Sequence, residues 1–507
     1  MKVLLSLLMF FSLQLTVFSQ NAEGRAGFPR LEPDPNALEF FRAESRNLSW
    51  TELARISLWA SGDLNASRFE QLRTAAGLIN SSPSLPAGDR EKAEFILDYM
   101  HTNLLKSYSL SSTGIDNLLS TGSFNCVSST VMYMILCKSA GVEVSGVVTK
   151  DHAFASVHAS GGTIDVETTN IYGFDPGNRR EFHDQFGRVT GFTYVPARNN
   201  RDRQEITFIE VISLILWNRI VECEDRSRFF EAVPLAIDRA ALLHGPTLAA
   251  NRNNYSALFA DPYSSLMDRI FNYGANLLRL GREEDCLLWA VYASPVFPDL
   301  KRWQDFIYAA VNNRLNKYFR AGQIADAAIF LENQKPLLDS GSYAKFETLV
   351  IDTDLINRAG LISNVAEGEA VAARIDEERR ANKINSMRAN ELLNFAVQKT
   401  AQIISAAPGS GGEPRLGSAA GSGGRDWLGA VKYIENAIAR FGTNSELEKA
   451  LAAYRSNLSS DFHNQFAAAY NNGNYEEARL ILEQGLAELP GDRRLISDMA
   501  ALNKIRN

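Results

Sequence analysis

Cysteine and histidine are scarce in this sequence, and that scarcity limits the chemistry the chain can carry. The 507 residues include only 4 Cys and 6 His. The four cysteines are widely scattered, a pattern that does not indicate a disulfide framework. No Cys or His pair has the spacing of a zinc site, and no Gly-rich phosphate loop with a lysine is present. We therefore expect neither a bound metal nor a cofactor.

Positive charge is also in short supply, since the formal net charge is −7. Nucleic-acid binding normally needs a basic face, so we expect no nucleic-acid partner. Long apolar runs are missing after the first residues. There, Lys2 is followed by an apolar run from Val3 to Phe18, and a cut after Ser19 fits the small-residue rule. Residues 1–19 therefore predict a signal peptide, an exported (periplasmic or secreted) protein, and no membrane attachment after cleavage.

The segment 34–205 reads as an α+β unit. Helical patterns precede residue 120, and strand-like stretches follow a predicted helix from Cys126 to Ala140. Ser160-Gly161-Gly162 joins the second and third of these stretches and predicts a hairpin turn. The strand-like stretches are VSGVVT, HAFASVHA, TIDVETT and FGRVTGFTYV.

Helical patterns dominate the rest of the chain. We expect an α-helical repeat-like region at 206–406, a flexible Gly/Ser-rich linker at 407–425, and further helices at 426–507. A loose repeat places a small residue where a second helix packs closely on a first, at Cys286, Ala327, Ala430 and Ala478. A fragment ending near residue 205 is expected to fold alone.

Cys126 has the sequence setting of a reactive thiol. Asn125 is a favoured helix N-cap, which places Cys126 at the first helical position. The positive end of a helix stabilises a thiolate at that position. A buried, inert cysteine is the alternative interpretation.

His152 strengthens the catalytic interpretation. It opens a strand in which alternate residues share a face, and Asp165 and Glu167 share a face on the next strand. A thiol, an imidazole and a carboxylate in that arrangement supply a nucleophile, a base and an orienting group. His158 is a rival base, and Asp175 is a more distant acid.

This segment resembles the transglutaminase-like superfamily, whose core is papain-like. The resemblance rests on Cys126 at a helix start, Ala140-Gly141-Val142 as the link to the first strand, and His152-Ala153-Phe154. Counting from His152 puts the family's acidic residue at Glu167, where this chain has Glu instead of the usual Asp. Asp165 is the alternative acid. A two-residue hairpin turn leaves Glu167 not directly opposite His152, so we expect a longer loop or a bulge to bring them together.

The resemblance implies an α+β, papain-like domain with Cys126, His152 and Glu167 as catalytic residues. The backbone N–H of Cys126 is the expected oxyanion donor. Asn125 is a second candidate donor, although helix capping alone explains this residue equally well. The last helices resemble a tetratricopeptide repeat at five positions of its second half, at the family's spacing: Gly473, Tyr475, Ala478, Leu482 and Pro490. Together these features predict a cysteine acyl-transfer enzyme acting on peptide or protein amides, with helical repeats that bind a protein partner. The alternative is a catalytically silent domain in a protein-binding scaffold.

Overall fold

The computed structural model describes residues 27–44, 48–177, 179–199, 201–248, 261–407, 425–442 and 444–504. The expected signal peptide, and all but the two end residues of the expected linker, lie outside these ranges. The chain forms two compact units, of which the first ends at Phe306 and the second begins at Ile307. In the described ranges, none of the helices combines the length and apolarity needed to cross a bilayer.

The first unit contains a four-stranded antiparallel sheet in the order β5-β4-β3-β6. Ala159 pairs with Gly162, so the predicted two-residue turn joins β4 to β5. A separate pair of short parallel strands, β1 and β2, precedes the sheet. The strands are β1 (Ser107–Tyr108), β2 (Ser123–Phe124), β3 (Val144–Val148), β4 (Ala153–Ala159), β5 (Gly162–Val166) and β6 (Gln204–Ile206).

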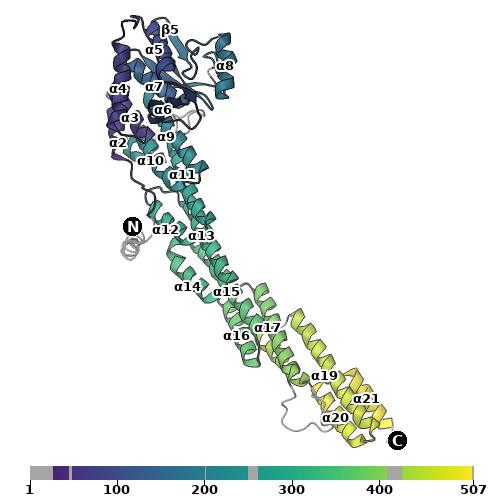
Figure 1. Cartoon of the computed structure of the whole chain (residues 1–507). Coiled ribbons are helices and arrows are strands. Elements are labelled where there is room, and N and C mark those ends of the chain that lie inside the picture. Colours follow the sequence, from purple (N-terminus) through teal and green to yellow (C-terminus); the bar gives the residue numbers. More distant parts are fainter. Residues whose placement is uncertain are drawn as a thin grey trace. The chain divides into compact units, whose positions relative to one another are not determined.

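Helix α7 (Cys126–Ser139) is the centre of this unit, because every side chain from Cys126 to Cys137 is buried. It packs against β3 and β4 on one side and against the N-terminal helices on another (Figure 1). The N-terminal helices that contact α7 are α3 (Trp50–Ser61), α4 (Ala66–Asn80), α5 (Asp89–Asn103) and α6 (Ile115–Thr121). Helix α2 (Pro35–Glu44) packs against α10 (Phe229–His244) instead.

One expected strand is wrong. The stretch FGRVTGFTYV begins inside a helix, α8 (Arg180–Thr190), and no residue of it lies in a strand. Phe182, Phe186 and Thr190 recur at every fourth position and are all buried, so they form the inner face of a helix. The β-branched and aromatic residues of the stretch resemble a strand only when this spacing is ignored.

Helix α9 (Phe208–Asp225) is built into the first unit and does not begin a separate one. It packs against α3 and α7, and β6, directly before it, pairs with β3. Gly146 in β3 permits the close approach, since a Cβ there would lie 2.1 Å from a methyl carbon of Val211. The boundary expected near residue 205 therefore does not separate the compact units.

The remaining helices of the first unit continue as antiparallel neighbours, with α10 against α9 and α11 against α10. They are α10 (Phe229–His244), the short 3-10 helix η2 (Gly245–Thr247), α11 (Pro262–Arg279) and α12 (Glu283–Ala293). Helix α13 (Leu300–Arg320) contains the division between the units.

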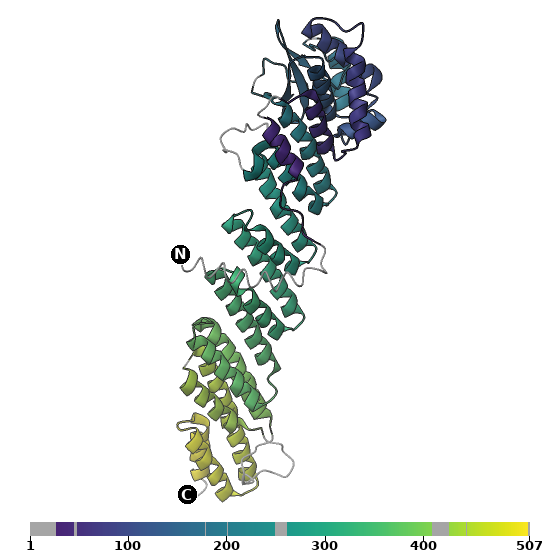
Figure 2. The same cartoon turned by 90° about the vertical axis from the view of Figure 1, so that its left-hand side faces the viewer.

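The second unit is helical throughout its described residues, and its helices stack in chain order (Figure 2). The three small residues expected at close contacts here, Ala327, Ala430 and Ala478, are fully buried, as is Cys286 of the first unit at 1% exposure. The helices are α14 (Ile324–Gln334), η3 (Lys335–Leu337), α15 (Ser340–Leu361), α16 (Val365–Arg380), α17 (Ser386–Ala406), α18 (Trp427–Phe441), α19 (Ser445–Asn471), α20 (Tyr475–Glu488) and α21 (Arg493–Lys504).

Candidate active site

Cys126 is the first residue of α7, and its backbone setting is fixed by Asn125. The Oδ1 atom of Asn125 accepts hydrogen bonds from the N–H groups of Val127 at 2.9 Å and Ser128 at 3.1 Å. Ser129 N–H bonds to the carbonyl of Asn125. Among the described residues, no acceptor is bonded to the Cys126 N–H. The positive end of α7 therefore offers one unused donor beside the thiol.

Asn125 makes hydrogen bonds that stabilise the local structure around Cys126. Its Nδ2 atom donates to the Leu110 carbonyl at 3.0 Å, and its backbone N–H bonds to the Ser128 hydroxyl at 2.9 Å. The residue is 2% exposed. Of the two expected oxyanion donors, the Cys126 N–H is therefore the better placed, and Asn125 holds the loop and the helix start around it.

His152 and Glu167 form a buried pair. The Nε2 atom of His152 lies 2.7 Å from Oε2 of Glu167, and the two side chains are 1% and 0% exposed. The other carboxylate oxygen of Glu167 accepts a hydrogen bond from the Thr169 hydroxyl at 2.9 Å. Both oxygens of this carboxylate thus have partners, which holds it in one orientation.

No longer loop or bulge brings these residues together, so that expectation is wrong. The β4–β5 ladder pairs Ser156 with Asp165 and ends at Val166. Glu167 lies one residue beyond the ladder, and its side chain is long enough to reach His152 diagonally. The chain then turns sharply, with the Glu167 N–H bonded to the Gly173 carbonyl at 2.8 Å.

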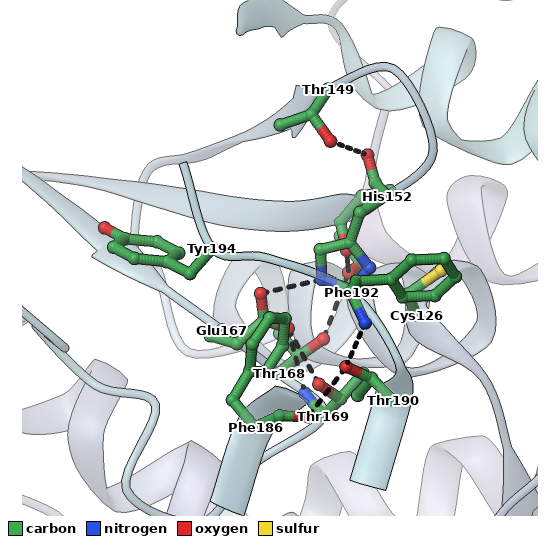
Figure 3. A network of polar contacts seen from close by, with 12 residues as sticks. Cys126, Thr149, His152, Glu167, Thr168, Thr169, Phe186, Thr190, Phe192 and Tyr194 are labelled. Carbon is green, nitrogen blue, oxygen red and sulfur yellow. Dashed lines mark hydrogen bonds and ion pairs between the residues drawn. The ribbon is translucent and has the colours of Figure 1, made fainter. Parts of the chain in front are cut away.

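The second ring nitrogen of His152, Nδ1, is buried and has no hydrogen-bond partner among the described residues. Cys126 is nevertheless close enough to act on the charge of the ring. In Figure 3 the sulfur lies on the side of the imidazole away from Glu167. Nδ1 is therefore the ring nitrogen on the side of Cys126. An imidazole that gives its Nε2–H to Glu167 leaves Nδ1 able to accept a proton.

The surroundings of His152 favour its protonated form. Burial alone would lower the pKa, but the charge of Glu167 and the neighbouring Cys126 outweigh burial and raise the pKa of His152 to about 10. The rings of Phe186 and Phe192 lie 5.3 and 5.2 Å from the imidazole, centroid to centroid. They reduce the access of water to the ring.

Asp165, the alternative acid, has different partners. Its two oxygens accept a forked pair of hydrogen bonds from Arg203, at 2.6 and 2.8 Å, and one oxygen accepts another from the Tyr194 hydroxyl at 2.6 Å. The structure therefore brings Glu167, and not Asp165, to His152. Asp165 instead fastens the segment that follows Phe192 onto the sheet.

The rival base and the distant acid also lie elsewhere. His158 contacts Ser145 and Glu205, each at 2.9 Å, on the partly exposed side of the sheet. Asp175 pairs with Arg90 at 2.9 Å. In the described ranges, no group of three or more His, Cys, Asp or Glu residues is arranged to hold a metal ion.

Thr168 and Thr169 hold Glu167 in place, a role that was not predicted from the sequence. Thr168 is fully buried, and its hydroxyl bonds to Ser129 at 2.8 Å and Thr130 at 3.0 Å, both on α7. Thr169 holds Glu167. The two threonines tie the acid to the helix that carries Cys126. Their position directly after Glu167 was the available signal.

A cavity of about 690 Å³ opens beside Cys126 and His152. This volume is in the range of sites that bind small ligands or short peptides. Phe192 and the loop that carries Lys150 and Asp151 line part of it. Leu110, Ser111 and Thr113 form another part of the wall. A further part comes from α9 and from Arg239 of α10, which the sequence did not associate with the site.

No protein-family model matches the chain, and no curated protein matches it.

Proposed function

We propose that this protein is an exported cysteine acyl-transfer enzyme of transglutaminase-like type, with a papain-like core, acting on peptide or protein amides. One observation carries the proposal. Cys126, at the positive end of α7, and His152 line the same cavity, and the Nε2 atom of His152 is bonded to the buried Glu167. Export rests on the leader-like sequence that contains Lys2 and the apolar run after it.

Acylation would begin with Cys126 as a thiolate and its proton held at Nδ1 of His152, an arrangement that the raised pKa of His152 favours. The thiolate attacks the carbonyl carbon of the amide, and the carbonyl oxygen becomes an oxyanion next to the Cys126 N–H. His152 then donates the proton to the nitrogen of the departing amine. A thioester on Cys126 remains, and Glu167 keeps the ring in position throughout.

Deacylation would use the same groups in reverse. His152 removes a proton from the incoming nucleophile, which attacks the thioester and releases the Cys126 thiolate. Water as nucleophile gives a peptidase or amidase reaction, and a primary amine gives a cross-link.

The second unit would supply a surface for a protein partner. Its described helices stack as antiparallel neighbours with small residues at their contacts, and arrays of this type present extended binding faces. The last helices retain the tetratricopeptide-like positions Ala478 and Leu482 as buried contacts.

Selective alkylation tests the proposed nucleophile. Burial raises the pKa of Cys137 and that of Cys286 to about 12, and it also raises the pKa of Cys223. Cys126 should therefore react with iodoacetamide faster than these three thiols near neutral pH, as measured by mass spectrometry of the intact protein and its peptides. A Cys126 that reacts no faster would favour the silent scaffold instead.

A further inference from the structure

One face of α9 lines the cavity beside Cys126. Each of its lining residues has another three or four positions away, which places them in one stripe along the helix. The stripe is apolar at Leu214, Trp217 and Val221 and polar between and beyond them. The complete set is Leu214, Trp217, Asn218, Val221, Glu222 and Asp225.

The apolar members of this stripe are not needed for the core. The opposite side of α9 fills that role with Ile212, Ile215 and Ile220, each fully buried. Val221 is 36% exposed, and Trp217 is partly exposed. Apolar side chains that remain open inside a hollow are typical of ligand contact.

Trp217 is held in place. The guanidinium groups of Arg239 and Arg269 each lie 5.0 Å from the centre of its ring. Arg269 is fixed in turn by Glu224 at 2.8 Å. On the next residue, Asn218 donates to the Thr113 hydroxyl at 2.9 Å. The stripe is therefore a rigid surface that binds without much loss of side-chain freedom.

Charge does not select the ligand here. Lys150 and Asp151 bring opposite charges to the cavity, and Glu222 pairs with Arg226 at 2.9 Å. With both signs present, the apolar stripe is the feature that distinguishes one peptide from another.

We propose that Trp217, with Leu214 and Val221, determines specificity by accommodating a large apolar or aromatic side chain in the acyl part of a peptide substrate. This inference rests on the proposed function of Cys126. The acyl part is assigned because it stays attached to Cys126 after the amine leaves, so contacts with it act in both steps of the reaction. The cavity that contains Cys126 and His152 is the one that Trp217 lines.

Two matched probes test the assignment on the full chain. Both are peptidyl chloromethyl ketones, identical except for Phe or Gly next to the reactive group, and iodoacetamide reports the intrinsic reactivity of the thiol. The wild type should label at Cys126 at least about tenfold faster with the Phe probe than with the Gly probe. Trp217→Ala should bring this ratio close to one, with each probe rate divided by the iodoacetamide rate of the same variant.

Two further variants complete the design. Phe230→Ala removes an aromatic side chain that is 47% exposed on the neighbouring α10 and does not line this cavity, so the ratio should stay at the wild-type value. Val221→Trp should slow the Phe probe by filling the cavity. Should Trp217→Ala fail to fold by circular dichroism, Val221→Trp decides the question, because position 221 is open to solvent.

The outcomes separate the two proposals. The specificity assignment would be overturned by equal Phe and Gly labelling rates in the wild type. It would also be overturned if the Phe-to-Gly ratio stayed at the wild-type value in both Trp217→Ala and Val221→Trp. In either case, selective iodoacetamide labelling of Cys126 would still support Cys126 as the nucleophile. If iodoacetamide labelled Cys126 of the wild type no faster than the other three cysteines, the proposed function would be overturned, and the specificity assignment with it.

Discussion

The imidazole of His152 and the carboxylate of Glu167 are joined by a contact of 2.7 Å in a region closed to solvent. Because the pair uses Nε2, the free ring nitrogen is the one on the Cys126 side. The carboxylate thus selects which nitrogen of His152 is able to exchange a proton with the thiol. The first two predictions concern this pair.

Glu167→Gln should lower the turnover of an amide substrate by about 10³- to 10⁴-fold, because a neutral amide no longer orients and stabilises the imidazolium. The fold should survive, since Gln can still accept the hydrogen bond from Thr169. Kinetics on a model amide, together with circular dichroism, measure both effects. The matched control is Asp165→Asn, which changes a carboxylate that does not contact His152.

Asp165→Asn should lower stability more than it lowers turnover. Loss of the charge of Asp165 weakens a largely buried pair with Arg203, so unfolding should become easier by about 3 kcal/mol with a smaller change in turnover. A turnover loss larger for Asp165→Asn than for Glu167→Gln would transfer the orienting role to Asp165.

The stability of the wild type should depend on pH through His152. The folded pKa of His152, about 10, exceeds the ordinary value of 6.5. The stabilisation is therefore fully present below about pH 6.5 and is lost as the pH rises toward 10. Urea unfolding of the wild type and of His152→Gln at several pH values should show the difference between them shrinking over this window. A difference that stays constant would contradict the prediction.

Gly173→Ala should disturb the loop that begins at Glu167. A Cβ at position 173 would lie 1.9 Å from the Glu167 carbonyl oxygen and 2.8 Å from that of Asn170, so the backbone must move. We expect a destabilisation of about 1–3 kcal/mol, typical of overpacking, together with reduced turnover. Gly161→Ala is the control, because a Cβ there meets nothing within 4 Å. Equal melting temperatures for the two variants would show that the loop is not constrained as described.

A fragment ending at Ile206 should not fold stably, whereas a fragment ending at Phe306 should. The shorter piece lacks the buried face of α9, which packs against α3 and α7, and leaves their apolar side chains in water. Cooperative unfolding and dye binding to exposed apolar surface distinguish the two. A compact, cooperatively unfolding short fragment would restore the boundary expected from the sequence.

Tyr108→Phe should leave stability unchanged or raise it by up to about 1 kcal/mol. The Tyr108 hydroxyl is buried without a hydrogen-bond partner among the described residues, and removing such a group relieves a desolvation cost. Chemical denaturation of the two proteins measures the change. A clear loss of stability would reveal a partner for the hydroxyl that the structure does not include.

The local parts of the site were predictable from the sequence. The helix start at Cys126 follows from the capping preference of Asn125, and the side of the strand on which His152 lies follows from the two-residue period. The position of Glu167 was found by counting and not from geometry. Its contact depends on how the chain leaves β5, which short-range rules do not describe.

The wall of the cavity was not predictable in the same way. Trp217 lies some ninety residues after Cys126 in the chain, and its place beside the thiol depends on the packing of α9 on α7 and on the open space at Gly146. The helical period of the sequence predicts the helix α9. It does not predict which other element the cavity-lining face of α9 lies beside. The misassigned strand at α8 has the same origin, since its inner face is defined by what Phe182 and Phe186 contact.

The isolation of the four cysteines from one another has a redox consequence. All four are free thiols, and Cys137 lies near the other end of the helix that Cys126 begins. When an oxidant converts Cys126 to a sulfenic acid, no neighbouring thiol is available to condense with it and protect it as an internal disulfide. The acid is left to small external thiols or to further, irreversible oxidation. Under oxidising conditions, the lifetime of the Cys126 thiol therefore depends on the reductants that reach the cavity from outside.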